Sequence, residues 1–375
     1  MRKNMLSFGV FPAVFLPLFL SLSIAKSAED VTFRDVTFET YKLYEGPINR
    51  TIRSGDKIAD FLSKDDFHFV KIKGQNVPVL RRNSLADLRI VSEIVVEESN
   101  VEEIQAGFLG NSTDVKLLSL KGNRITSIEY GVFNNLELIS IDLTSNKIAS
   151  IDSRAFDDMP SLITLRLDDN LIADWNPNWF KNTPLLAVIS MQRNRLEEIP
   201  ADAFGNLKGD KRQEDIDFNV SLAFSYNRIK TIHPEAFSGL EKIHSLWFDH
   251  NRLDDFDGNL LTGIRVGNLR LNHNEIKCFK SDLDKVLTAE NNYIDSNPFD
   301  CECLERIKAY SKTSGKKVHI VMAEMDCVSR RIQAKMAALE NRLKELKLLN
   351  RSPEIAGKKE VEDVEVFDTK KISIK

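Results

Sequence analysis

The sequence has no excess of basic residues and no catalytic signature motif. Its 52 Lys and Arg residues are outnumbered by 56 Asp and Glu residues, which gives a formal net charge of −4. Because the nucleic-acid backbone selects a strongly basic surface, nucleic acid is not expected as a partner. The chain also lacks a G-x-S-x-G, an H-E-x-x-H and a glycine-rich phosphate loop, and its six histidines are scattered. We therefore expect no enzyme, no cofactor and no metal site.

Long hydrophobic runs are absent after the N-terminus. Arg2 and Lys3 precede an apolar stretch from Met5 to Ala25, which is typical of a secretory signal (1–25) cleaved after Ala25 or after Ala28. An uncleaved signal anchor is the alternative, because the stretch approaches the length that spans a bilayer. No second run of that length follows, so we expect a secreted, extracellular protein in an oxidising compartment. Four N-x-[ST] sequons, which are glycosylated in secreted proteins, support this prediction and predict glycosylation at Asn49, Asn111, Asn219 and Asn350.

A repeated motif organises the chain between Val115 and Ile294. Each copy has alternating apolar residues followed by an asparagine, as in LLSLKGNRITSI (117–128) and SLAFSYNRIKTI (221–232). These framing asparagines stand at positions 123, 146, 170, 194, 227, 251, 274 and 292, with spacings of 23, 24, 24, 33, 24, 23 and 18 residues. Ser99 and Gln75 take the same place in two degenerate copies, so the chain holds about ten units.

This motif resembles the leucine-rich repeat, L-x-x-L-x-L-x-x-N-x-L, over residues 68–296. The resemblance implies an α/β repeat solenoid, a leucine-rich repeat horseshoe with a parallel β-sheet on its concave face. Each L-x-L would form a short strand, and each coil would bury its neighbour. The asparagine would satisfy backbone groups that the turn leaves unpaired. Residues 26–67 lack cysteine and alternate like strands over 31–46, so we expect them to cap the first coil.

The run NPFDCECL (297–304) resembles the cysteine-containing C-terminal flank of extracellular leucine-rich repeat proteins, here over residues 297–328. That family pattern joins the first of four cysteines to the third and the second to the fourth. Cys301, Cys303 and Cys327 match the first three, but the remaining cysteine, Cys278, stands upstream. Because C-x-C partners are strained, two pairings remain, and we favour Cys301–Cys327 with Cys278–Cys303. The alternative is a bridge from Cys278 or Cys303 to a second chain.

Residues 329–350 are predicted to form an amphipathic helix. Fewer than three heptads are short for an independent coiled-coil dimer, so we slightly favour a helix folded onto the C-terminal cap over intermolecular pairing. The apolar seam of the helix alternates spacings of four and three residues through Ile332, Met336, Leu339, Leu343 and Leu346.

Residues 351–375 are charged and lack a pattern, which is typical of a disordered tail.

The positions beside the strand leucines would face the concave side, where such solenoids usually bind. In the later copies they combine aromatic residues with arginines, which are enriched at binding hot spots. Trp247 is the most informative, because the repeat needs no large aromatic on the outer face of its strand. The alternative is a solvated surface. The predicted partner-binding residues are Arg166, Arg193, Tyr226, Trp247, Asp249, His250, Arg270 and His273.

The order of signal, repeats, cysteine cap and heptad helix resembles the secreted leucine-rich immune proteins of insects. That resemblance implies a recognition protein that binds a protein or glycan ligand through its concave face. It also implies a homo- or heterodimer, formed through the helix or an interchain disulfide. Two other roles remain as alternatives: an extracellular matrix or adhesion protein like the small leucine-rich proteoglycans, and a non-catalytic accessory subunit of a secreted enzyme.

Overall fold

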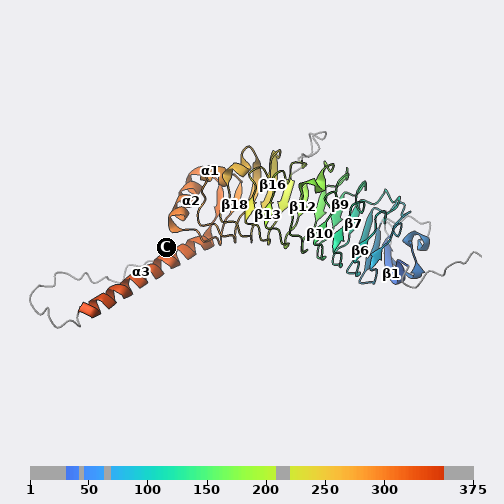
Figure 1. Ribbon diagram of the computed structural model, residues 1–375, viewed down its shortest axis with the longest axis horizontal. Helices are drawn as coiled ribbons and strands as arrows, with labels where there is room; N and C mark the ends of the chain where they lie inside the picture. The colour runs from blue at the N-terminus through green and yellow to red at the C-terminus, as the bar shows by residue number, and fades with distance from the viewer. Residues whose placement is uncertain (1–30, 42–45, 63–68, 208–219, 350–375) are drawn as a thin grey trace, which may run out of the picture. The chain divides into compact units, whose positions relative to one another are not determined.

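The computed structural model describes residues 31–41, 46–62, 69–207 and 220–349. The chain divides into two compact units, residues 1–162 and 163–375, and each consists mainly of parallel strands (Figure 1). The expected signal, the sequons at Asn219 and Asn350 and the charged tail lie outside the described residues. The two other sequon asparagines, Asn49 and Asn111, are exposed.

The first unit is a parallel sheet that ends in an antiparallel hairpin. Two pairs of two-residue strands connect successive coils away from this sheet: β4 (Val79–Leu80) with β6 (Glu103–Ile104), and β8 (Ser127–Ile128) with β10 (Ser150–Ile151). A short 3-10 helix, η1 (Ile58–Phe61), follows the hairpin. The strands of the sheet, in their order across it, are β9 (Ser140–Asp142), β7 (Leu117–Ser119), β5 (Glu93–Glu97), β3 (Phe69–Lys73), β1 (Phe33–Tyr41) and β2 (Pro47–Gly55).

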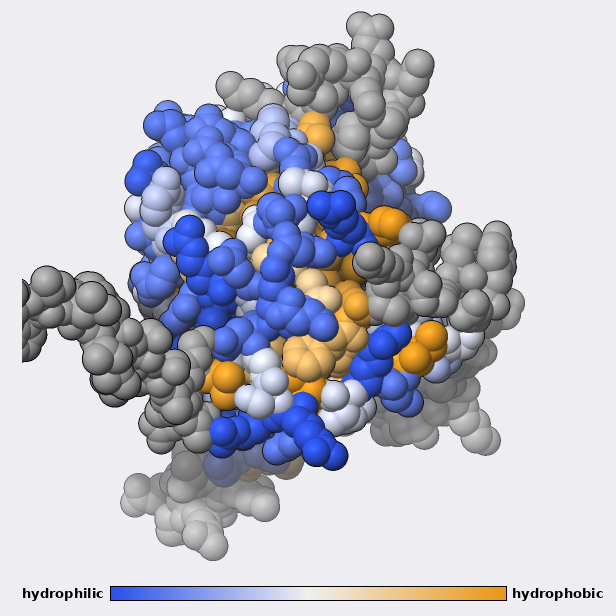
Figure 2. All heavy atoms as spheres, turned by 90° about the vertical axis from the view of Figure 1, so that its right-hand side faces the viewer, coloured by the Kyte–Doolittle hydropathy of each residue, from blue (hydrophilic) through white to orange (hydrophobic). Residues whose placement is uncertain are grey.

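The hairpin formed by β1 and β2 caps the first coil without a disulfide. β1 runs antiparallel to β3, with Glu39 opposite Lys71, and so continues the sheet. Its inward side chains Phe33, Val36 and Phe38 are at most 1% exposed. At this end of the molecule hydrophilic residues surround a smaller hydrophobic area (Figure 2). Of the residues 31–46 that were expected to alternate like strands, Phe33–Tyr41 form β1.

The second unit continues the same architecture and carries the helices. Its short pair is β13 (Glu198–Ile199) with β15 (Thr231–Ile232), and its 3-10 turns are η2 (Pro177–Phe180) and η3 (Gly258–Leu261). The helices are α1 (Leu283–Val286), α2 (Cys301–Ser314) and α3 (Val321–Leu349). The parallel strands, in order, are β11 (Thr164–Arg166), β12 (Val188–Ser190), β14 (Val220–Ala223), β16 (Lys242–Trp247), β17 (Arg265–Arg270), β18 (Asn291–Tyr293) and β19 (Lys317–His319).

The interior of each unit is filled by leucine, isoleucine and phenylalanine side chains from equivalent positions of successive coils. In the first unit Phe133 stacks on Phe156, with ring centroids 5.7 Å apart. In the second, Phe204 stacks on Phe237 at 5.3 Å, and Phe224 on Phe248 at 5.4 Å. These rings are all at most 1% exposed. Most phenylalanines of the described residues are therefore part of the core.

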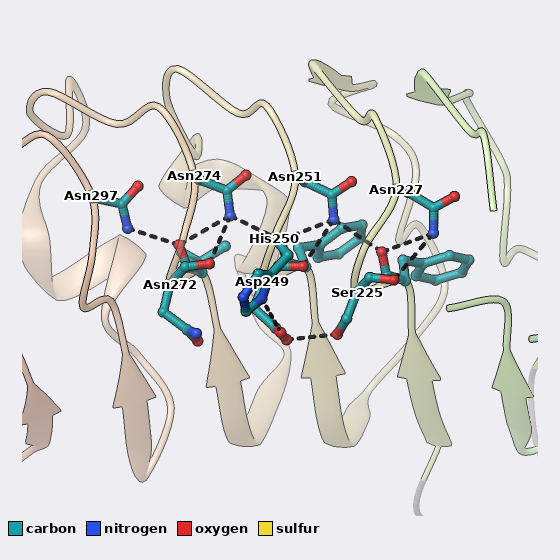
Figure 3. Close-up of polar contacts among 11 residues, drawn as sticks. Ser225, Asn227, Asp249, His250, Asn251, Asn272, Asn274 and Asn297 are labelled. Carbon is teal, nitrogen blue, oxygen red and sulfur yellow. Dashed lines mark hydrogen bonds and ion pairs between the residues drawn. The ribbon is translucent and has the colours of Figure 1, made fainter. Parts of the chain in front are cut away.

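In the second unit the framing asparagines Asn227, Asn251 and Asn274 each join their own coil to the preceding one (Figure 3). Asn251 Nδ2 donates to Phe248 O of its own coil at 3.1 Å and to Phe224 O of the preceding coil at 2.9 Å. Its Oδ1 accepts from Ile229 N, also of the preceding coil, at 2.9 Å. The side chain is 7% exposed, so these groups have no access to bulk water. The asparagine therefore satisfies the turn and fixes the register between coils.

The frame of the last coil differs from the sequence-based prediction. Asn297, and not Asn292, makes the ladder contacts: its Nδ2 donates to Leu271 O at 2.8 Å and to Ile294 O at 2.9 Å, and its Oδ1 accepts from Ile276 N at 3.2 Å. Asn292 instead points into the core from β18 and is fully buried. The prediction was wrong because Asn292 also follows apolar residues, whereas the step from Asn274 to Asn297 restores the usual spacing of 23 residues.

The C-terminal cap is closed by two disulfides within the chain. The structure contains the pairs Cys278–Cys303 and Cys301–Cys327, so no cysteine is free. Asp300 begins α2 by accepting from Cys303 N at 2.7 Å, and Gly315 ends it with φ 71°. The strand β19 then pairs in parallel with β18 and covers the edge of the last coil.

The helix α3 leaves its apolar seam exposed. It begins eight residues before the predicted start and is tied to the cap by the Cys301–Cys327 bridge and by Arg330, which donates to Phe299 O. The five seam side chains, from Ile332 to Leu346, are each more than half exposed. The preference for a seam folded onto the cap was therefore wrong, because the cap already covers the last coil with α2 and β19.

We expect Asn251→Ala to lower the free energy of unfolding by about 1–3 kcal/mol, because it leaves buried backbone groups of two coils without partners. Equilibrium urea denaturation followed by circular dichroism measures the change. Asn272→Ala is the matched control, since the Asn272 side chain points away from the ladder (Figure 3). Equal stability of the two variants would contradict the role given to the framing asparagine.

Candidate ligand-binding surface

The residue before each framing asparagine adopts the left-handed backbone conformation. In the second unit these residues have φ between 53° and 59°, and most of their N–H groups donate to the next coil, as Tyr226 N does to Asp249 O at 3.0 Å. In the first unit Gly74 and Gly122 take this place in two coils, and Glu98 and Ser145 take it in two others. A side chain with a Cβ costs about 1–2 kcal/mol in this conformation. The residues of the second unit are Asp169, Arg193, Tyr226, His250, His273 and Ser296.

Four of these side chains stack into a continuous row, which we call the loop ladder (Arg193, Tyr226, His250 and His273). The Arg193 guanidinium lies 4.8 Å from the Tyr226 ring centroid. The Tyr226 and His250 rings are 3.9 Å apart and inclined by 15°. The His250 and His273 rings follow at 4.1 Å and 23°. Because equivalent residues of adjacent coils are one strand spacing apart, the planar groups meet face to face.

A second row runs along the outer ends of the strands, and we call it the strand ladder (Trp247, Arg270, Tyr293 and His319). Register places these residues opposite one another in β16, β17, β18 and β19. The Arg270 guanidinium lies between two rings, 4.4 Å from the Trp247 centroid and 5.4 Å from that of Tyr293. Tyr293 in turn stacks on His319 at 4.3 Å and 4°. The guanidinium is held rigidly by cation–π contacts on both faces.

Asp249 supports the loop ladder from beneath (Figure 3). It is 6% exposed. Its Oδ1 accepts from Ser225 Oγ at 2.6 Å, and its Oδ2 lies 3.0 Å from His250 Nδ1. Burial lowers the pKa of His273, and the neighbouring His250 lowers it further. His273 therefore favours its neutral form more than an isolated histidine does.

A pocket lies beside the strand ladder, between Arg166 and Trp247. Its volume is about 300 Å³, and small side chains such as Ser190 and Ala223 line it between the two larger ones. Asp168 also lines it, with Oδ1 accepting from Ser190 Oγ and from Gln192 N, both at 2.6 Å. A volume of this size is at the lower end of ligand pockets, enough for one large side chain of a partner.

All eight residues predicted for partner binding lie in the second unit. Six belong to the two ladders, Asp249 supports one of them, and Arg166 stands across the pocket from Trp247. Sequence reasoning missed Tyr293 and His319. Tyr293 was missed because the last coil was aligned on Asn292, and this alignment assigned Thr288 to the strand position that Tyr293 occupies. A step of 23 residues from Arg270 would have found it. His319 lies in the cap, where no repeat pattern indicates it.

Neither a metal site nor a membrane-spanning helix is found in the part of the chain that the structure describes. No group of three His, Cys, Asp or Glu side chains there could hold a metal ion. Within the same residues, every helix is too short or too polar to cross a bilayer.

Comparison with known proteins identifies related repeats. A family model of the leucine rich repeat matches residues 113–172 and 138–196. Osteomodulin of Bos taurus is 25% identical over 213 residues, which are 50% of this chain and 48% of that protein. Leucine-rich repeat transmembrane protein FLRT2 of Homo sapiens is 27% identical over 175 residues, 46% of this chain and 24% of that protein. The chain thus spans about half of osteomodulin and a smaller part of FLRT2.

Solved structures share the fold. The structure of the Toll–Spatzle complex of Drosophila superposes with a TM-score of 0.56 at 19% identity, covering 64% of this chain and 31% of that chain. At this identity the likeness concerns the fold alone. It agrees with the parallel strands and asparagine turns of both units.

We expect Tyr226→Gly and Tyr226→Val to differ in stability by about 1–2 kcal/mol, with the glycine variant more stable. Both lose the contact with His250, but only valine keeps a Cβ in the left-handed region, where branched side chains fit worst. Urea denaturation of the two variants measures the difference. Equal stabilities would show that the loop relaxes and stores no strain.

Proposed function

We propose that this leucine-rich repeat protein, closed by a disulfide-bonded C-terminal cap, is a secreted, non-enzymatic recognition protein. Its two ladders would bind a protein or glycan ligand on the solvent face of the second unit. The single observation that carries the proposal is the pair of stacked rows of aromatic, histidine and arginine side chains. The coils do not need them, because the core and the framing asparagines already hold the repeats together.

The geometry of the ladders favours a protein ligand over a sugar. The ring faces in both rows contact one another, so they are covered and a sugar ring has little face to stack on. What remains are polar ring edges, namely phenol O–H groups and imidazole nitrogens, which can donate hydrogen bonds to a protein partner and accept them from it. Aromatic and arginine side chains held in fixed positions also lose little entropy when a partner binds.

Innate immunity is one setting for such a protein, in keeping with the resemblance to secreted leucine-rich immune proteins and the fold shared with Toll. A matrix or adhesion role fits about equally well, in keeping with the match to osteomodulin. The third role, a non-catalytic accessory subunit of a secreted enzyme, uses the same binding surface. All three require secretion, and the identity of the captured partner separates them.

We expect Trp247→Ala combined with Arg270→Ala to abolish capture of the partner from extracellular fluid, with the melting temperature nearly unchanged. The pair lies outside the core, so its loss costs contacts worth only about 0.5–1 kcal/mol each. Capture followed by mass spectrometry is the readout. The matched control removes an equivalent exposed pair from the first unit, Tyr130 and Arg154, whose cation–π distance is 4.5 Å. Capture that survives the first change but not the control would refute this site.

The exposed seam of α3 supports a second proposal, that two copies of this chain associate through this helix. Leu339 and Leu343 are 61% and 54% exposed, and an uncovered apolar stripe of this kind is stabilised by pairing. Lys335 and Glu340 flank the seam at positions that would meet across a parallel pair. Because all four cysteines are paired within the chain, the dimer would be non-covalent.

We expect the secreted protein to run as a monomer in non-reducing electrophoresis and to show a concentration-dependent dimer in sedimentation equilibrium. Leu343→Glu should abolish the dimer, because it places charges in the apolar seam. Ala338→Glu adds the same charge outside the seam and should leave the dimer intact. A monomer at all concentrations, or equal effects of the two substitutions, would rule out pairing through α3.

A further inference from the structure

The row of residues that forms the strand ladder begins with a gap. Register aligns Trp247 of β16 with Ala223 of β14. It aligns Ala223 with Ser190 of β12, and Ser190 with Arg166 of β11. Adjacent strands are about 4.8 Å apart, so the backbones of Arg166 and Trp247 are separated by about 14 Å. Between them Ser190 and Ala223 carry no planar group, whereas the ladder that follows is made of planar groups.

This gap is the pocket of about 300 Å³ beside the strand ladder. Its two large side chains close the ends. One long side is the register row of Val188, Ser221 and Ser245, which lie two residues earlier in their strands and therefore on the same face of the sheet. Asp168 and Gln192 form the other side. The pocket is thus bounded by side chains of the second unit alone.

Trp247 offers a ring face to this pocket. The Arg270 guanidinium covers one face of the indole at 4.4 Å. On the other side the register neighbour is Ala223, whose methyl group covers little of an indole. Arg166, an exposed side chain, lines the opposite end. An aromatic face and a guanidinium therefore stand at the two ends of one pocket.

An aromatic ring is the group that suits both ends. The strand ladder shows how such groups alternate, because the Arg270 guanidinium lies between the rings of Trp247 and Tyr293. A ring inserted beside Trp247 stacks on the indole and turns its second face toward the Arg166 guanidinium. Both faces of an aromatic ring are electron-rich, so one group makes both contacts.

Other groups suit the pocket less well. A guanidinium or an ammonium would be repelled by Arg166, and a carboxylate would meet Asp168. A sugar can lie on an indole, but its saturated ring has no π face for the guanidinium. The charges at the rim therefore favour a neutral ring.

We propose that the pocket between Arg166 and Trp247 is the anchor site for one aromatic side chain of a protein partner. This inference rests on the proposed function, because it names the group that part of the same surface recognises. An aromatic side chain seated in a pocket of this kind is typical of the few residues that dominate the free energy of a protein interface.

The test uses the secreted full chain labelled with 5-fluorotryptophan and followed by fluorine NMR. Trp247 is one of three tryptophans, and the other two, Trp175 and Trp179, are only 8% and 3% exposed, so the Trp247 signal reports on the pocket. The variant Trp247→Phe assigns that signal. The probe is N-acetyl-phenylalaninamide, and N-acetyl-cyclohexylalaninamide has a similar size without π electrons. We expect a saturable shift of the Trp247 signal and roughly tenfold tighter binding of the aromatic probe.

Two variants localise the binding. Ala223→Phe fills the gap from within the chain and should abolish the shift. Ser119→Phe is the matched control, because it adds the same ring at the equivalent strand position of the first unit and should leave binding unchanged. Arg166→Met removes the charge and should reduce the preference for the aromatic probe about twofold to fivefold. This last variant keeps the test decisive if Ala223→Phe does not fold.

Three results would overturn the proposal: no shift with the aromatic probe, equal affinities of the two probes, or a shift that persists in folded Ala223→Phe. Methyl β-galactoside is measured in the same way, and a shift with this sugar alone would make the pocket a glycan site. Failure here is distinguishable from failure of the proposed function. If Trp247→Ala with Arg270→Ala abolishes capture of the partner while neither probe moves the Trp247 signal, recognition stands and the aromatic anchor does not.

Discussion

The rest of this structure depends on the hydrogen bonds that framing asparagines such as Asn251 make across two coils. Asn251 joins its own strand end to that of the preceding coil, and Asn274 and Asn297 repeat the contact. A buried turn leaves backbone N–H and C=O groups unpaired, and an amide supplies both a donor and an acceptor at one place. The bond therefore decides three things at once: the register between coils, the left-handed residue before the asparagine, and the direction in which that residue's side chain points.

Register of this kind makes equivalent positions interact along each unit. Adjacent strands are about 4.8 Å apart, so a side chain on the solvent face meets its counterpart in the next coil. Planar groups at that spacing stack, as Tyr226 and His250 do at 3.9 Å, and like charges would repel. A large outer side chain is therefore favourable when the neighbouring coil offers a matching one. The ladders are accordingly properties of several coils together, and a single residue such as Trp247 has its geometry because Arg270 and Tyr293 follow it.

Most of the fold could be predicted from the sequence, because the alternating apolar residues and the asparagines are dictated by coil stacking. The eight site residues could be placed on one surface for the same reason, since their spacing follows the repeat. What could not be predicted depends on contacts outside the pattern. Tyr293 was missed because the last coil was framed on Asn292, and His319 was missed because it lies in the cap, outside the repeat pattern. The stacking of rings in the loop ladder depends on a left-handed backbone that no residue type in Arg193, Tyr226 or His250 indicates. The seam of α3 was expected to be covered, because its apolar spacing does not say what lies opposite.

The loop ladder places large planar side chains at a left-handed position that other coils fill with glycine or with smaller side chains such as Ser145 and Ser296. Glycine fills this position in two coils of the first unit, at Gly74 and Gly122, where the same backbone conformation is needed without the strain of a Cβ. Tyr226, His250 and His273 accept that strain and place their edges in solvent, where they add nothing to the core. Their stacking recovers part of the free energy, about 0.5–1.5 kcal/mol for a well-placed pair, but glycine would serve the fold as well. The apolar seam of α3 likewise adds nothing to the core, because its side chains from Ile332 to Leu346 are exposed and are not covered by the cap.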